Sequence, residues 1–398
     1  MNFLFSYRSD STSKRSKILP TFLWALIITV IFGVEISAQA LQFRGYVKEL
    51  GSLAFSNDLG TVNYDNIVHN RLETVWDAND NFELKLDLRN RLISGNSVSS
   101  TPLYADFLDD DPGFLDMSWI LLESDAHVLH STIDRAQLTY FNGPFEATLG
   151  RQRINWGQTF VWSPNDLFNA YAYLDFDYEE RPGTDAFSAE YAWGFASSVN
   201  LGYRFGDSLN ESVIAVMYRD NFAEYDIQLL AGSHFDEWMV GAGWSGYFRD
   251  AGFKGEISYF QPKSSSSTEK NIVTASMGFD YMLPNAVYIS GEFLYNGGFE
   301  SAGNTLAQIS QPPSADNLFI AKTGFYLNGS FSASPLTTIS LSTLGSFDES
   351  VFILIPQVSY SISENTDLLF LSQLLRGDGL TAFTNTPNLL FFRVKWSF

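Results

Sequence analysis

Short segments in which apolar and polar side chains alternate recur from residue 41 to the end of the chain. Successive side chains of an extended strand point to opposite faces, so each segment has one apolar face and one polar face. One such segment also fits a soluble sandwich, but a long series predicts a transmembrane antiparallel β-barrel with lipid outside and water inside. The clearest segment spans residues 82–89, where Phe82, Leu84, Leu86 and Leu88 alternate with Glu83, Lys85, Asp87 and Arg89.

The breaks between these segments are of two kinds. Short breaks carry tight-turn residues, as at residues 142–144 and 284–285, and they alternate with connections that are mostly longer. The pattern predicts an all-β fold of about 18 strands (16 to 18) over residues 41–398, with short periplasmic turns, long extracellular loops and an aqueous lumen. The longer connections are expected at 56–66, 95–125, 155–185, 262–270, 297–316 and 377–387.

The last strand-like segment ends the chain on an aromatic residue. Its apolar face holds Leu390, Phe392, Val394, Trp396 and Phe398, and its other face holds Arg393 and Lys395. This pattern resembles the closing strand of Gram-negative outer-membrane barrels. The resemblance implies that Phe392, Val394, Trp396 and Phe398 form the signal read by the barrel-assembly machinery, and it predicts a location in the cell outer membrane.

The first 40 residues predict an export signal. Lys14, Arg15 and Lys17 precede an apolar run, and the Ala-Gln-Ala at residues 38–40 has the small-x-small pattern of a cleavage site. We expect residues 1–40 to be a cleaved signal peptide. The alternative is an uncleaved anchor, because the apolar run is nearly long enough to span a bilayer.

Composition agrees with this fold and excludes some function classes. The chain has 35 Phe, 19 Tyr and 9 Trp, which fits aromatic girdles at the two membrane interfaces. It has no cysteine, which excludes disulfides and thiolate metal or redox sites. The formal net charge of −21 argues against nucleic acid as a partner, because nucleic-acid binding needs a cationic surface.

The most distinctive local sequence is Gly150-Arg151-Gln152-Arg153-Ile154-Asn155-Trp156-Gly157-Gln158, followed at a distance by Arg181-Pro182-Gly183-Thr184-Asp185. A GRQ-x-x-NWG stretch at a strand end, a long loop and RPG at the next strand start resemble a group of porin-like outer-membrane proteins similar to alginate-export barrels. Gln158 departs from the acidic residue expected after NWG, and the intervening loop is unusually aromatic and acidic. The resemblance implies a channel and identifies no substrate.

The loop between these two motifs is the candidate pore constriction. A loop that folds into the lumen with opposing charges restricts the size of solutes and orients them. In this arrangement arginines face the loop acids, which include Asp166, and Trp156 packs the loop against the inner wall. The candidate residues, for a constriction or for an outer rim, are Arg151, Arg153, Asn155, Trp156, Asp175, Asp177, Glu179, Glu180, Arg181 and Asp185.

The parity of the strand leaves the direction of Arg151 and Arg153 open. They share a face with Leu149, which points them outward unless Gly150 introduces a bulge. On an outer rim their guanidinium groups would bind the phosphates of lipopolysaccharide. A purely structural role is the third reading.

The sequence supports other chemistry less well. Acidic residues cluster at 106–116 and 166–185, which fits a cation-attracting mouth, a calcium site or solvated loop surface, and we favour the last. His127 and His130 are three positions apart on a strand, so they face opposite ways and do not share a metal. We predict no cofactor, no metal site and no catalytic residue.

The sequence therefore predicts a passive outer-membrane channel for small hydrophilic solutes such as sugars or cations, without enzymatic activity. Two alternatives stay open. One is a non-conducting barrel with a structural or surface-binding role, and the other is an outer-membrane hydrolase, although no GxSxG motif occurs and Ser131 and His130 face opposite ways. The expected partners are outer-membrane lipid, lipopolysaccharide, the barrel-assembly machinery and the solutes. A homo-oligomer is allowed without a sequence signal for it.

Overall fold

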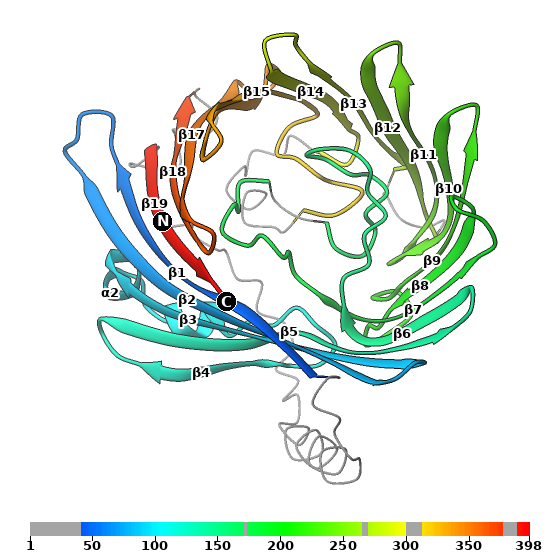
Figure 1. The fold of residues 1–398 in the computed structure, drawn as a ribbon, viewed down its shortest axis with the longest axis horizontal. Helices are drawn as coiled ribbons and strands as arrows, with labels where there is room; N and C mark the ends of the chain where they lie inside the picture. Colours follow the sequence, from blue (N-terminus) through cyan, green and yellow to red (C-terminus); the bar gives the residue numbers. More distant parts are fainter. Residues whose placement is uncertain (1–40, 171–172, 265–269, 300–312, 377–387) are drawn as a thin grey trace.

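The computed structural model describes residues 41–170, 173–264, 270–299, 313–376 and 388–398. The predicted signal peptide at residues 1–40 lies outside the described residues, as do parts of four connections. The strands form a ring, and segments drawn in green and in yellow-orange lie inside it (Figure 1).

Alternation of apolar and polar residues produces long strands throughout the described residues, because each strand has one face for each environment. The strands are β1 Leu41–Phe55, β2 Val62–Asn79, β3 Phe82–Gly95, β4 Ser118–Glu123, β5 His127–Asn142, β6 Phe145–Gln152, β7 Thr184–Ala192, β8 Ser198–Arg204, β9 Val213–Phe222, β10 Tyr225–His234, β11 Glu237–Phe248, β12 Ala251–Pro262, β13 Ile272–Met282, β14 Val287–Asn296, β15 Thr323–Ser334, β16 Thr337–Ser346, β17 Val351–Ser363, β18 Thr366–Arg376 and β19 Asn388–Ser397.

The sheet closes on itself through antiparallel pairing. β1 pairs with β2 on one side and with β19 on the other, from Tyr46 opposite Ser397 to Phe55 opposite Asn388. β4 is an extra short strand, which pairs with residues 128–132 of β5, whereas β6 pairs with residues 136–142 of the same strand. The other 18 strands form the closed barrel, which confirms the predicted fold class and strand number.

The even strand number places the start of β1 and the end of β19 at one end of the barrel, which we call the turn end. Connections there are short, for example residues 80–81 and 143–144. The opposite end, the loop end, carries the long connections 96–126, 153–183 and 297–322. Short and long connections therefore alternate in much of the barrel, as the sequence predicts.

The loop end departs from this pattern at two places. At the loop end β10 and β11 are joined by residues 235–236 alone, and Phe235 has the positive φ of 54° that two-residue hairpins use. The connection expected at 297–316 extends to residue 322, because β15 begins at Thr323. The Asn296 side-chain amide donates to the carbonyls of Phe319 and Ala321, at 2.6 and 3.1 Å, and so diverts this segment from the sheet.

Two helices of five residues each, α2 Asn96–Ser100 and α3 Tyr104–Leu108, follow β3 at the loop end. They pack on a small apolar cluster with Ile93 and Val128. Within the described ranges no helix has the length and apolar character needed to cross a membrane.

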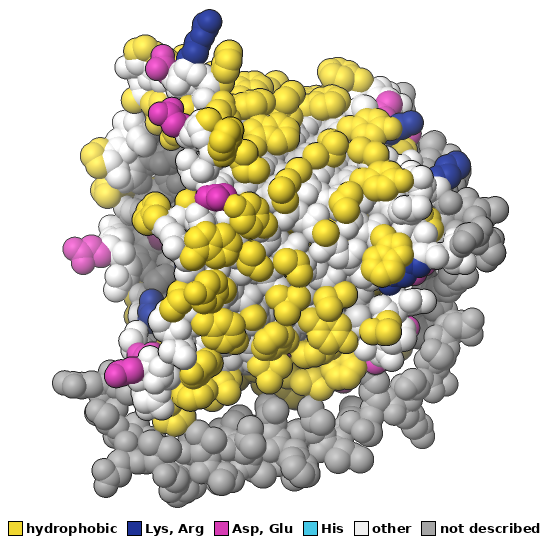
Figure 2. Space-filling model, turned by 90° about the vertical axis from the view of Figure 1, so that its right-hand side faces the viewer, with side chains coloured by type: hydrophobic (Ala, Val, Ile, Leu, Met, Phe, Trp, Pro, Cys, Tyr) yellow, Lys and Arg dark blue, Asp and Glu magenta, His cyan; other side chains and the backbone are white. Residues whose placement is uncertain are grey.

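The outer face of the barrel is apolar. Figure 2 shows hydrophobic side chains spread over the wall that lies on the right of Figure 1, around β9 to β12. Leu229 and Val240 on this wall are 52% and 54% exposed. Exposing so much apolar surface to water is unfavourable, whereas lipid solvates it. Lipid cannot hydrogen-bond the backbone N–H and C=O groups, and the closed pairing of the strands satisfies them instead.

The inner face is polar and carries charges of both signs. Its buried side chains include Lys48, Arg71, Asp87, Arg135, His130, Gln228, Glu256 and Glu292. These side chains alternate along the strands with the outward apolar ones. The inner face therefore supplies hydrogen-bonding groups to whatever occupies the lumen.

Candidate pore constriction

Residues 153–183, the connection between β6 and β7, lie inside the barrel and are called the inner loop here. In Figure 1 they form the green trace within the ring of strands. Their described residues contact side chains of β9 to β12, β14 and β19, and of β1, β2 and β5, as the following paragraphs detail. The loop thus lines the lumen around much of the wall.

Two buried glutamates hold the first half of the inner loop by its backbone. Glu292 on β14 accepts the N–H groups of Phe160, Val161 and Trp162 at 2.7, 2.9 and 2.8 Å. Glu256 on β12 accepts the N–H groups of Gln158, Thr159 and Asn165. Carboxylate bonds to several N–H groups are strong, so they fix a stretch of irregular backbone against the wall.

Aromatic side chains pack the same half of the loop against the wall. Trp156 is 6% exposed, and its ring meets Phe168 edge-on at 4.9 Å. Both belong to a core with Val213, Met217 and other inward residues of β9 to β12. Trp156 therefore packs this half of the loop against the inner wall.

Ion pairs hold the second half of the inner loop. Asp177 lies 2.6 Å from the Lys48 Nζ of β1. Glu179 binds both cations of the last strand, Lys395 at 2.7 Å and Arg393. The acids of the loop therefore meet basic residues of the wall.

A second set of contacts joins the loop to β1, β2 and β5. Glu180 accepts a hydrogen bond from the Tyr46 hydroxyl at 3.2 Å. Tyr178 donates to Asp134 at 2.7 Å, and Asp134 in turn binds Arg71. Arg135 donates to the backbone carbonyls of residues 180 and 181 at 2.9 and 2.8 Å.

Two loop carboxyl groups have shifted pKa values. Burial alone would raise the pKa of Asp177, but its contacts with His69 and Lys48 hold the pKa at about 2. Burial raises the pKa of Asp166 to about 6, against the smaller opposing effect of the Arg153 charge. Asp177 is therefore a charged anchor at neutral pH, while Asp166 changes its charge in mildly acidic solution.

Arg151 and Asp185 lie apart from the lumen. They face each other across β6 and β7 on outward positions, with Arg151 Nε 2.9 Å from Asp185 Oδ1, and Asp111 lies 2.7 Å from Arg151 Nη1. Residues 112–117 cover this trio. The Leu115 N–H donates to Asp185 Oδ2 at 2.8 Å, and the Leu115 carbonyl accepts from Arg151 Nη2 at 2.6 Å. The β5–β6 register has no shift, so Gly150, with φ of 121°, does not turn Arg151 inward.

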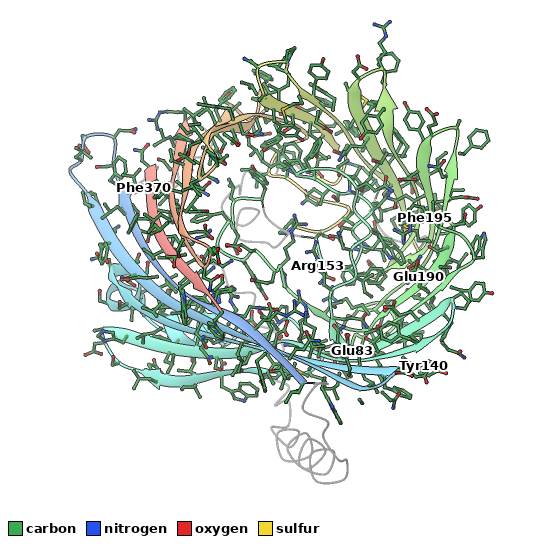
Figure 3. All side chains as sticks on the ribbon, viewed as in Figure 1. Glu83, Tyr140, Arg153, Glu190, Phe195 and Phe370 are labelled. Atoms are coloured by element: carbon green, nitrogen blue, oxygen red, sulfur yellow. The ribbon has the colours of Figure 1, made fainter. Side chains whose placement is uncertain are left out.

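Arg153 and Asn155 line a cavity of about 250 Å³ on the lumen side of β5 to β9. The cavity also holds Glu146, which faces Glu190 across β6 and β7, and Arg219 lies 3.3 Å from Glu190. Figure 3 shows Arg153 inside the ring of strands and Glu190 on the adjoining wall. The cavity thus offers charges of both signs.

The other candidates occupy scattered places. Asp175 is exposed on the inner loop, and Arg181 lies at its end with a positive φ of 56°. Gly157 is needed for close packing rather than for a positive φ, because a Cβ there would lie 2.5 Å from the Ser163 hydroxyl. The sequence does not single out Glu256, Glu292 and Lys48 as contacts of the loop, because their only signal is a charged residue at an inward strand position.

The acidic and histidine clusters show no metal-binding group of three or more ligands in the described parts of the chain. Asp111 accepts the backbone N–H groups of Gly113 and Met117, so it shapes the loop. His130 lies buried beside Arg91, whereas the adjacent Ser131 donates to Asn90 on the outer face. The pair therefore diverges, as alternation requires.

No protein-family model matches the sequence. A comparison with curated proteins also gives no match. The likeness of the GRQ-x-x-NWG segment to alginate-export barrels thus stays a hypothesis.

Solved structures share the fold. The outer membrane protein OpdK of Pseudomonas aeruginosa has a TM-score of 0.53 at 9% identity, over 90% of this chain and 99% of that one. OccAB4 of Acinetobacter baumannii has a TM-score of 0.53 at 10% identity, over 90% and 98%. OccD3 of Pseudomonas aeruginosa has a TM-score of 0.52 at 8% identity, over 89% and 91%. The chain therefore has the closed barrel fold of Gram-negative outer-membrane proteins.

Proposed function

We propose that this protein is an outer-membrane channel for passive diffusion of small hydrophilic solutes. The observation that carries the proposal is the inner loop, which lies inside a barrel whose inner face is polar. A loop held inside the lumen narrows it, and the groups on both surfaces can exchange hydrogen bonds with a passing solute. Diffusion through such a lumen needs no cofactor.

The lumen chemistry favours polar solutes that carry both donors and acceptors, such as sugars. The cavity beside the inner loop combines Glu146 and Glu190 with Arg153 and Arg219. Asp177 and Glu179 are neutralised by wall cations, which weakens the attraction of the loop for free cations. We therefore rank sugars above cations as solutes.

Location and assembly belong to the same proposal. An apolar outer face and a closed barrel suit the outer membrane. Phe398 exchanges two backbone hydrogen bonds with Gly45, at 3.0 and 2.9 Å, so the C-terminal residue helps to close the barrel. We infer that residues 1–40 are removed on export, that Phe392, Val394, Trp396 and Phe398 guide assembly, and that outer-rim residues meet lipopolysaccharide.

Liposome swelling tests the function. Purified barrel in liposomes should admit a small monosaccharide quickly and larger oligosaccharides progressively more slowly, because a narrowed lumen selects by size. Absence of swelling with every sugar, from barrel shown to be folded and inserted, would contradict the proposal.

One observation favours a second function, a non-conducting barrel with a structural or binding role. The inner loop is fastened at many points, and residues 313–322 also fold inward, with Phe319 packed on Trp162 at 5.2 Å between ring centres. Together these segments could fill the lumen. Swelling experiments separate the two functions, because a filled lumen admits no sugar of any size.

A further inference from the structure

The outer face of β1, β2, β3 and β5 differs from the opposite wall of the barrel. Five outward positions there carry polar side chains, namely Glu49, Asn66, Asn70, Asn90 and Ser131, and we call this set the polar patch. Ser131 is buried at 5% exposure, so it supports the patch from beneath, and the other four form its surface. On the opposite wall, seen in Figure 2, most outward positions of β9 to β12 are apolar. Examples are Ile214, Val216, Leu229, Trp238, Val240 and Ile257, which are 43% to 59% exposed.

The polar patch lies within the height of the apolar band. Glu49 is exposed on β1 between Val47 and Leu53, two outward apolar residues that are 38% and 39% exposed. In the registers of its neighbours it lies opposite Val394 and Val68. A carboxyl group at this height meets hydrocarbon if lipid covers the wall, and lipid-facing charge destabilises a barrel.

Three of the remaining patch residues form a hydrogen-bonded row at one level. Asn70, Asn90 and Ser131 lie opposite one another on β2, β3 and β5. The Ser131 hydroxyl donates to Asn90 Oδ1 at 2.7 Å, and Asn90 Nδ2 donates to Asn70 Oδ1 at 3.3 Å. Each lies between outward apolar neighbours on its own strand, for example Leu88 and Leu92 around Asn90. Amides keep spare donors and acceptors after such bonds.

A small residue adjoins the patch. Gly51 occupies an outward position of β1, next to Asn66 on β2. A Cβ at Gly51 would meet no atom closer than 3.9 Å, so the packing within this chain does not require glycine there. Without a side chain at Gly51, a neighbouring membrane protein can approach the backbone of β1 closely.

We propose that the polar patch is the contact surface for a second copy of this chain within the membrane. The partner must itself span the membrane and must present donors and acceptors at the same height. A second copy does both. Within the chain Asn66 donates to Glu49 Oε1 at 2.9 Å, which leaves the second carboxylate oxygen as an acceptor. The Asn70 and Asn90 amides each make one N–H bond within the chain and keep a second N–H group as a donor, so the patch is complementary to itself. Symmetric contacts of this kind are the commonest route to homo-oligomers. The proposal is independent of what passes through the lumen.

The first experiment measures oligomeric mass. Wild-type barrel extracted with its native lipid should appear as an oligomer in native mass spectrometry. The E49L/N66L variant should be a monomer that keeps the heat-modifiable gel mobility of a folded barrel, because leucine suits lipid. The matched control T343L, at an outward position of β16, should stay oligomeric. A monomeric wild type, or an oligomeric E49L/N66L variant, would overturn the proposal.

Crosslinking tests the same contact without the E49L/N66L variant, so it remains informative if that variant fails to fold. The cysteine-free sequence allows single thiols to be introduced without background. Val68→Cys, beside the patch, should crosslink with a bismaleimide in isolated outer membranes at least tenfold more than Val240→Cys, which lies on the opposite wall at 54% exposure. Equal crosslinking of the two variants, or none of Val68→Cys, would contradict self-association through this face.

Discussion

Lys395 on the last strand holds Glu179 of the inner loop, with 2.7 Å between Nζ and Oε2. Arg393, two positions earlier on the same face, binds the other oxygen of this carboxylate. The strand that closes the barrel therefore also fastens the loop inside it. Substitutions at this contact should therefore change the ion selectivity of the channel.

E179Q should shift ion selectivity toward anions. The change removes one negative charge and leaves Lys395 and Arg393 with no carboxylate partner on the inner loop. We expect the chloride-to-potassium permeability ratio to rise about twofold at low salt and the effect to shrink at high salt, because salt screens exposed charges. Reversal potentials in a salt gradient measure this ratio. E364Q, in a turn outside the lumen, is the control and should leave the ratio unchanged.

E292Q should loosen the first half of the inner loop. The amide donates where the carboxylate accepts, so at least one buried N–H group of Phe160, Val161 or Trp162 loses its partner. An unsatisfied buried donor costs about 2 kcal/mol, which corresponds to roughly thirtyfold faster amide exchange. Hydrogen exchange read by mass spectrometry reports on this segment. D280N, on the neighbouring strand at the turn end, should leave the exchange rates as in wild type.

The stability of the docked loop should fall as the pH rises from 4 to 6. The folded pKa of Asp166 is about 6 against an ordinary value of 3.8, so folding favours the neutral acid. Its stabilising effect is complete below the ordinary value and is lost as pH rises through the folded value. The difference amounts to at most about 3 kcal/mol. Asp177, with a pKa of about 2, stays ionised throughout this window.

Thermal unfolding of D166N at several pH values checks this effect. The variant should lose less stability between pH 4 and 6 than wild type does, and at pH 4 the two should match. D250N, in a turn between β11 and β12, should keep the wild-type profile. A D166N profile that falls as steeply as wild type would assign the effect to another group.

R151M should destabilise the barrel wall near residues 109–117. Methionine leaves Asp111 and Asp185 buried without a cation, and breaking a buried ion pair from one side costs about 3 to 5 kcal/mol. R219M breaks the more exposed pair with Glu190, whose side chains are 45% and 34% exposed, and should cost less than about 1 kcal/mol. Temperature-dependent gel mobility ranks the two variants. Equal losses would contradict the buried role of Arg151.

The barrel could be predicted because the alternation of apolar and polar side chains identifies each strand and its lipid-facing side. The outward direction of Arg151 follows from parity with Leu149, and the register shows no shift there. The partners of the inner loop were not predictable, because Glu179 and Lys395 are 216 positions apart and only closure of the barrel brings them together. The same holds for Glu256 and Glu292, since an inward glutamate gives no sign that it binds backbone N–H groups of a distant loop.

Single-channel recording in planar bilayers tests the central claim, that the inner loop narrows an open lumen, most directly. Wild-type barrel should insert with discrete, ohmic conductance steps. In a second variant a short Gly-Ser linker replaces residues 158–180, and its gel mobility shows that the barrel is folded. This variant should conduct in larger steps, because the lumen is wider without the inner loop. Silent insertion of wild type, or equal steps from wild type and the variant, would contradict the account.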